Sequence, residues 1–143
     1  MQKMNNDVLQ SVLEIIRACD SVMLATFGAG EYPDVRHVTN QMNRDATTAR
    51  LHFLTGNTTP KYAQILKNPG CCLYYYNPEN RHALRLYGKL EIINDTEFKN
   101  ELWRDDFKRF GYSGPDDKSF VILRFMPDEY KFYVGAEMKT GKF

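Results

Sequence analysis

Residues 33–61 read PDVRHVTNQMNRDATTARLHFLTGNTTPK, and this stretch is the most informative part of the chain. It indicates a strand that carries Arg36, a second strand that ends at Thr55, and a turn that opens a helix at Pro60. The first amides of a helix lack intrahelical partners and the helix dipole is positive there, so a helix N-terminus favours anions. Two hydroxyls, free amides and Lys61 converge at this helix start.

Two interpretations of this helix start are open. In the first, Arg36 adds a planar, permanently charged group from the neighbouring strand, and the cluster binds the phosphate of a phosphorylated cofactor. In the second, a threonine only caps the helix and Lys61 is solvated, since Ser and Thr caps are common. Spacing alone is compatible with both.

Apolar periodicity and turn residues divide the rest of the chain into elements. Strands are expected at residues 21–27, 35–42, 50–55, 71–76, 83–93, 120–126 and 130–134, and helices at residues 7–18, from Pro60 to about Asn68, and from Asp95 or Thr96 onward through Phe107. Asp7 is the expected cap of the first helix, Pro127-Asp128 is an expected turn, and residues 136–143 show no clear periodicity. Hairpin-length connections favour an antiparallel sheet, and a small closed or partly closed barrel would hide its strand edges.

The composition is that of an ordinary globular protein with one domain over residues 1–143. It is 43% hydrophobic and 26% charged, and 19 basic against 18 acidic residues leave a formal charge of +1. That balance creates no field that would attract nucleic acid, so no such partner is expected. No run approaches the ~20 apolar residues of a membrane span, and the polar start does not resemble a signal peptide.

Cysteine and histidine usage points away from disulfides and metals. Three cysteines, two of them adjacent, make a poor disulfide framework and fit a reducing cytoplasm, where we expect the protein to act. The alternation of Cys71 and Cys72 predicts that at least one thiol is buried and inert. None of the three histidines has a partner at metal-motif spacing, so no metal site is expected.

Once these pieces are placed in order, the chain resembles the pyridoxamine 5′-phosphate oxidase-like family of flavin-binding split barrels. It is most similar to the short members of the general-stress-protein type, and the likeness covers nearly the whole chain. The fold implied is mainly β (α+β), an antiparallel split β-barrel with flanking helices. The pieces that carry the resemblance are Pro33-x-x-Arg36-x-Val38, Phe53-Leu54-Thr55, Thr58-Thr59-Pro60-Lys61, Asn68-Pro69 and Tyr87-Gly88-Lys89.

The resemblance implies a homodimer that binds two FMN molecules in grooves at the subunit interface. In this family an arginine-led strand borders the flavin and its phosphate, the next strand end supplies a threonine, and a loop supplies a hydroxyl and a lysine. The corresponding cofactor-binding residues are Arg36, His37, Val38, Thr39, Asn40, Leu54, Thr55, Thr59 and Lys61. Because His37 alternates with Arg36, its side chain is expected to point away from the phosphate.

Four positions and the C-terminal segment depart from the family pattern. Leu54 stands where the family has an aromatic residue, Pro60 where it has a phosphate-loop arginine, and Ala83 where it has a glutamine. The oxidase's substrate residues are also missing, since Gln41 replaces a lysine and residues 139–143 lack the Arg-x-His signature. We therefore do not expect oxidation of pyridoxamine phosphate, and the loss at Pro60 removes one charge from the expected phosphate site.

The resemblance implies an FMN-dependent oxidoreductase that acts on an unidentified small molecule, with the flavin supplying the redox chemistry. Two alternatives are open: a flavin-binding or stress-related protein without specific turnover, and a split barrel that binds another ligand such as haem or a deazaflavin. No side chain is identified as a general acid or base, so the catalytic residues are left unassigned. His52 and His82 are interpreted as surface or satisfied histidines, and Trp103 as a packing residue.

Overall fold

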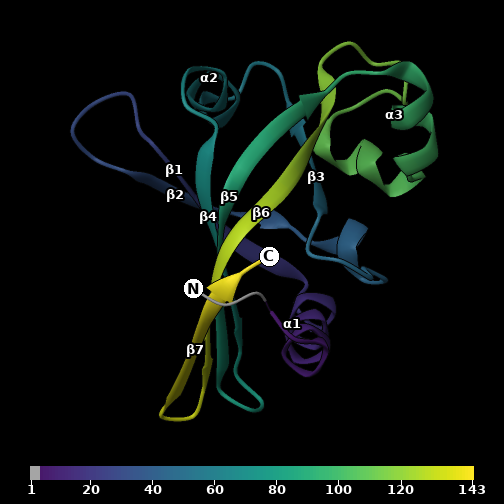
Figure 1. The fold of residues 1–143 in the computed structure, drawn as a ribbon. Helices are drawn as coiled ribbons and strands as arrows, with labels where there is room; N and C mark the ends of the chain where they lie inside the picture. Colours follow the sequence, from purple (N-terminus) through teal and green to yellow (C-terminus); the bar gives the residue numbers. More distant parts are fainter. Residues whose placement is uncertain (1–3) are drawn as a thin grey trace.

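Seven antiparallel strands form one sheet in the computed structural model, which describes residues 4–143 (Figure 1). The strands are β1 (Ser21–Thr26), β2 (Asp34–Thr39), β3 (Leu51–Gly56), β4 (Gly70–Asn77), β5 (His82–Ile93), β6 (Phe120–Val134) and β7 (Glu137–Lys142). The helices are α1 (Asn6–Ala18), α2 (Pro60–Lys67) and α3 (Thr96–Leu102), with short 3-10 helices η1 (Gln41–Asn43) and η2 (Asp105–Phe110). The strands pair in the order β2-β1-β4-β5-β6-β3, with β7 on β6, and this path does not close. The fold is therefore the expected split barrel.

Helix α1 packs on one face of the sheet and forms the main core with it (Figure 1). Its cap is Asn5, whose side chain accepts a hydrogen bond from the Val8 amide at 2.9 Å, so the prediction of Asp7 as the cap was wrong. Asp7 lies in the first turn, where its charge suits the helix dipole. The buried residues of this core include Val12, Leu13, Ile15 and Ile16 of α1 and Leu24, Leu73, Leu84 and Leu86 of the sheet.

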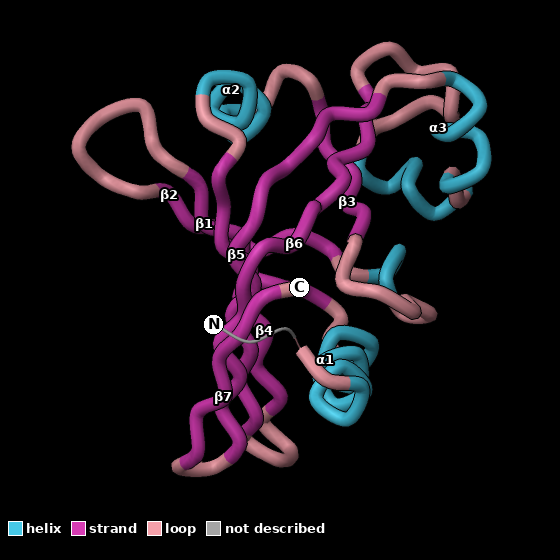
Figure 2. Tube along the Cα trace, viewed as in Figure 1, coloured by secondary structure: helices cyan, strands magenta, loops and turns pink. Residues whose placement is uncertain are grey.

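A second, smaller core lies at the other end of the sheet. Here α3, η2 and the loop that follows gather beside β3 (Figure 2). Phe107 and Phe120 are fully buried at its centre, and Trp103 packs edge-on against both rings, at 5.6 and 5.3 Å between centroids. The predicted continuous helix through Phe107 was wrong: α3 ends at Leu102 and Phe107 belongs to η2.

The C-terminal part of the sheet differs most from the sequence prediction. β6 runs through Pro127 without the expected turn, because Pro127 lies where the pairing with β5 shifts register between Tyr87 and Gly88. Proline is tolerated at such a bulge, where a ladder hydrogen bond is already missing. The tail without periodicity forms β7, which pairs with the second half of β6. The sheet has seven strands, as expected, but the two predicted at residues 120–126 and 130–134 are one strand, β6, and the seventh strand, β7, was not predicted.

The second strand also ends earlier than expected. β2 stops at Thr39, and the chain then turns through η1 instead of continuing to Met42. Within residues 4–143, none of the helices combines the length and the apolarity needed to cross a bilayer.

Candidate functional site

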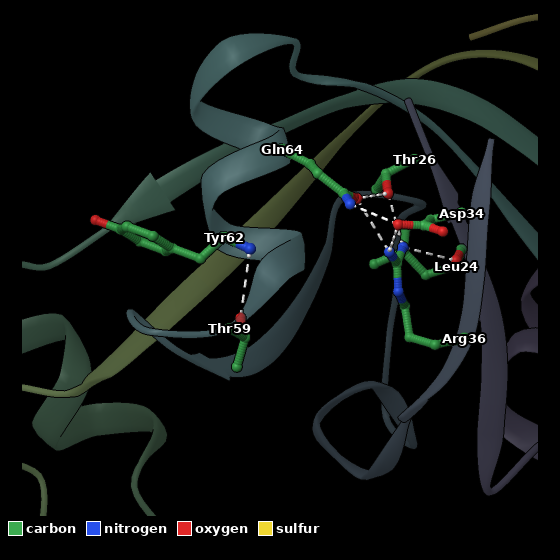
Figure 3. Close-up of polar contacts among 7 residues, drawn as sticks. All are labelled: Leu24, Thr26, Asp34, Arg36, Thr59, Tyr62 and Gln64. Atoms are coloured by element: carbon green, nitrogen blue, oxygen red, sulfur yellow. Dashed lines mark hydrogen bonds and ion pairs between the residues drawn. The ribbon is translucent and has the colours of Figure 1, made fainter. Parts of the chain in front are cut away.

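Helix α2 begins at a tight polar turn that follows β3. Thr59 is the N-cap: its hydroxyl accepts from the Tyr62 amide at 3.3 Å (Figure 3). The same hydroxyl donates to the Gly56 carbonyl at 2.9 Å. The Thr55 hydroxyl lies 3.3 Å from the same oxygen. Pro60 occupies the first turn, where its missing amide proton costs nothing. A threonine therefore caps α2, as the second interpretation expects. Whether the helix start is also a phosphate site depends on the surroundings of Lys61.

A pocket of about 370 Å³ opens beside this turn, and we call it the site pocket. It lies between the end of β2, the end of β3, the start of α2 and the end of η2 with the loop that follows. Seven of the nine residues expected to bind a cofactor line it. They are His37, Val38, Thr39, Leu54, Thr55, Thr59 and Lys61.

Lys61 contributes a positive charge to the lining of the site pocket. It is half-buried, and among residues 4–143 its ammonium group forms no hydrogen bond or ion pair. Burial lowers the pKa of Lys61, and the positive charge of Arg36 lowers it further. A partly desolvated cation beside a second cation is stabilised by an anion, so the pocket favours a negatively charged group.

Arg36 does not line the site pocket. Its guanidinium donates to the Leu24 carbonyl at 3.1 Å, to the Thr26 hydroxyl at 2.8 Å and to Gln64 Oε1 at 3.1 Å (Figure 3). Burial lowers the pKa of Arg36, and nearby Asp34 opposes that effect. Arg36 thus ties β2 and β1 to α2, while His37, expected to point away from the phosphate, lines the pocket together with Lys61.

Asn40 lies in the core. Its amide nitrogen donates to the carbonyls of Ile16 and Cys19 at 2.6 and 2.8 Å, and its oxygen accepts from the Tyr75 hydroxyl at 3.0 Å. The side chain is fully buried and joins the end of α1 to β4. Asn40 therefore fixes the end of β2, and with it the positions of pocket residues 37–39, which directly precede Asn40.

Six residues of the site pocket were missing from the sequence prediction: Asp20, Ser21 and Gly56, and three from a distant part of the chain. Arg109, Phe110 and Tyr112 come from the end of η2 and the following loop. The Arg109 guanidinium lies over the Phe110 ring at 4.8 Å, and burial raises the pKa of the Tyr112 hydroxyl, with a further rise from Asp117. No periodicity or motif links this polar stretch to Lys61, so only the tertiary structure reveals that they share a pocket.

A larger cavity of about 700 Å³ lies elsewhere on the sheet and contains none of the nine expected residues. Cys71 and Cys72 both line it, together with Tyr87 and Phe143. Burial raises the pKa of Cys71 to about 12, and burial also raises the pKa of Cys72. Both thiols therefore stay protonated near neutral pH, which agrees with the expected absence of a reactive thiol pair.

The donor set of the site pocket fits a phosphorylated flavin. Lys61 and the first amides of α2 suit a phosphate, and Arg109 adds a second cation to the lining. Val38, Leu54 and Phe110 supply the apolar surface that a flat ring requires.

Known proteins with similar sequences and folds bear on this arrangement. General stress protein 26 of Bacillus subtilis (strain 168) is 28% identical over 134 residues, which cover 92% of this chain and 91% of that protein. A protein related to general stress protein 26, of the pyridoxinephosphate oxidase family, from Clostridium acetobutylicum shares the fold with a TM-score of 0.85. The match has 23% identity and covers 98% of this chain and 97% of that chain.

Two more distant solved structures share the fold alone. A pyridoxamine 5′-phosphate oxidase-related, FMN binding protein from Nostoc punctiforme PCC 73102 matches with a TM-score of 0.68 at 18% identity, covering 96% of this chain and 95% of that chain. A heme binding protein from Mycobacterium smegmatis matches with a TM-score of 0.67 at 13% identity, covering 91% of this chain and 57% of that chain. The sequence model of the pyridoxamine 5′-phosphate oxidase family matches residues 8–133, most of the chain. The protein therefore belongs to the pyridoxamine 5′-phosphate oxidase family.

Proposed function

We propose that this protein binds FMN in the site pocket and acts, as a homodimer, as an oxidoreductase on a small molecule. The observation that carries the proposal is the half-buried Lys61 ammonium, which has no acceptor among residues 4–143 and stands at the start of α2. An FMN phosphate would supply the missing negative charge. Family membership and the FMN-binding relative from Nostoc favour a flavin as the bearer of that phosphate.

Each of the nine expected residues has a task in this proposal. Lys61 and the amides beside Thr59 hold the phosphate, Thr55 supports that turn, and Val38 and Leu54 shield one side of the ring from water. The backbone of His37 and Thr39 borders the ring. Arg36 acts through its charge and by holding α2 against β1, and Asn40 fixes the end of β2. When bound, the flavin supplies the exchange of hydride or electrons with the substrate.

The sheet offers a face for a second copy of the chain, opposite the face that α1 covers. Met23 and Tyr74 are paired across β1 and β4 and are 38% and 37% exposed, which is unusual for central positions of a sheet. Arg85 and Lys131 continue the same row on β5 and β6. We call this row the outer sheet face. Aromatic and apolar residues beside an arginine are typical of a protein–protein interface, and a partner there would complete the homodimer.

The test of flavin binding is the visible absorption spectrum of the purified protein, with and without added FMN, after exhaustive dialysis. We expect a retained flavin spectrum at close to one FMN per chain. Absence of retained flavin after reconstitution would overturn the proposal. Reduction of the bound flavin by a nicotinamide coenzyme then separates an oxidoreductase from a flavin-binding protein without specific turnover, which would reduce slowly and unselectively.

The phosphate contact is tested by Lys61→Ala. Loss of a charge-assisted contact should weaken FMN binding by about 1–3 kcal/mol, measured by quenching of flavin fluorescence. Lys67→Ala is the matched control, because Lys67 lies exposed in the last turn of α2 and outside the site pocket. Equal affinity of the two variants would remove Lys61 from the site.

Haem binding is the second candidate function. It is favoured by the imidazole of His37 in the site pocket, a ligand suited to iron, and by the fold of the haem-binding mycobacterial protein. A haem titration that yields a saturable Soret band, lost in His37→Ala, would favour this candidate over FMN.

A further inference from the structure

One wall of the site pocket comes from a segment distant in the sequence from its other walls. The end of η2 and the loop after it bring Arg109 and Tyr112 to the same pocket as Lys61 and Thr59. This part of the chain lies with α3 beside β3 (Figure 1). The sequence indicated no ligand-binding role for it.

The segment is anchored firmly enough to present a side chain in a defined position. Phe107 is fully buried in the small core, and Gly111 ends η2 with a φ of 98°, its amide donating to the Lys108 carbonyl at 2.9 Å. The following loop is joined to the turn before α2, because the Asn57 amide donates to the Ser119 carbonyl at 2.9 Å.

Asp117 organises that loop from within. Its carboxylate accepts from the amides of Ser113 and Ser119, both at 2.9 Å, and from both serine hydroxyls. These bonds lower the pKa of Asp117. The buried Lys99 donates to the Asp117 carbonyl at 3.1 Å and joins the loop to α3. The loop that contains Tyr112 is therefore held both by α3 and by the turn before α2.

The charges that face the site pocket leave it positive. Asp20 is its lining carboxylate, and it is paired with Arg44 at 2.6 Å. Among residues 4–143 neither Arg109 nor Lys61 has a carboxylate partner. Arg109 rests on the Phe110 ring, which restricts the guanidinium without using its donors. The guanidinium of Arg36 is already occupied by Leu24, Thr26 and Gln64.

We propose that Arg109 is the second cationic ligand of the phosphate in the site pocket, with the Tyr112 hydroxyl as a neutral donor beside it. This inference rests on the proposed FMN site and adds the segment after α3 to it. Tyr112 lies close to the turn, since a Cβ added to Gly56 would stand 3.2 Å from its hydroxyl. Burial raises the pKa of that hydroxyl, so it stays protonated and able to donate. Arg109 and Lys61 together would neutralise a phosphate dianion.

The test compares FMN with riboflavin, which lacks the phosphate, in titrations of the full-length protein. Arg109→Gln should raise the Kd for FMN by about tenfold, the scale of one charge-assisted hydrogen bond at a partly exposed site. It should leave the Kd for riboflavin within about twofold of the wild-type value. Arg109→Lys should fall between the two, since it keeps the charge but loses the planar fork. Tyr112→Phe should raise the Kd for FMN by about threefold.

Lys108→Gln is the matched control, because Lys108 is an exposed neighbour in η2 outside the site pocket. If wild-type protein binds FMN and Arg109→Gln behaves like Lys108→Gln, the inference is overturned while the proposed function stands. An equal loss for FMN and riboflavin would also overturn it, because Arg109 would then support the ring or the fold. If the wild-type protein binds neither flavin, the proposed function and the inference fail together.

Discussion

Arg36 and His37 are neighbours in β2 that serve opposite sides of the strand. The Arg36 guanidinium donates hydrogen bonds to Leu24, Thr26 and Gln64. His37, in contrast, lines the site pocket together with Lys61. The charge of Arg36 still reaches Lys61 and contributes to the lowered pKa of that lysine. An arginine can therefore influence an anion site without touching the anion, by making the neighbouring lysine more dependent on a negative partner.

The lowered pKa of Lys61 predicts a pH dependence of FMN binding. Deprotonation removes the ammonium charge, so affinity should fall as the pH rises, and the fall should begin at lower pH than for an ordinary lysine. In Lys61→Arg the charge persists as the pH rises, and the affinity should change less. Fluorescence titrations at each pH measure both proteins. Parallel profiles would rule out Lys61 as the titrating group.

His52 predicts a pH dependence of stability. Burial lowers its pKa, and the charges of Arg124 and Arg50 lower it further. Arg124 Nε donates to His52 Nε2 at 3.2 Å, a bond that requires the neutral ring. A folded-state pKa below the unfolded value means that the unfolded chain binds protons first, so stability is complete above the ordinary histidine pKa and is lost as the pH falls below it.

Thermal unfolding from about pH 7.5 to about pH 5.5 measures this effect. The Tm of the wild-type protein should fall more than that of His52→Gln, whose side-chain oxygen accepts from Arg124 without titrating. If the Tm of the two proteins falls by the same amount, groups other than His52 cause the loss of stability in acid.

At the scale of elements, the β5–β6 bulge depends on Gly88. A Cβ at this position would overlap the Met126 carbonyl oxygen and lie 2.9 Å from the Phe125 ring. Because the nearest obstacle is backbone, Gly88→Ala should lower the free energy of unfolding by about 1–3 kcal/mol, the cost of overpacking a core. Chemical denaturation measures it. Gly30→Ala is the control: a Cβ there meets nothing within 4 Å, and a change within about 0.5 kcal/mol is expected.

At the scale of the whole molecule, the outer sheet face predicts the oligomeric state. Tyr74→Glu places a charge at the centre of that face and should raise the Kd of the homodimer by at least about tenfold, as loss of a central aromatic residue does. Sedimentation velocity over a concentration series measures it. Tyr32→Glu is the control, since Tyr32 is 78% exposed in the loop between β1 and β2. Equal dissociation of the two variants would move the interface elsewhere.

The sequence by itself determined the elements that depend on neighbours along the chain. Apolar alternation located β5, and proline at the start with a threonine cap located α2. The order of these elements and the resemblance together determined the split barrel. The resemblance also implied that residues of β2, β3 and α2 share one site, and these residues line one pocket although β2 and β3 stand at the two ends of the strand order.

Tertiary structure alone decided the features that depend on distant partners. β7 is a polar edge strand held by backbone pairing with β6, so its side chains carry no pattern. Pro127 signals a turn locally, and only the register shift against β5 lets β6 continue through it. The hydrogen bond from Arg36 to Gln64, and the presence of Arg109 and Lys61 in one pocket, depend on how α2 and η2 pack against the sheet. Local periodicity contains no information about such packing, since it reports the face of each element and not what that face meets.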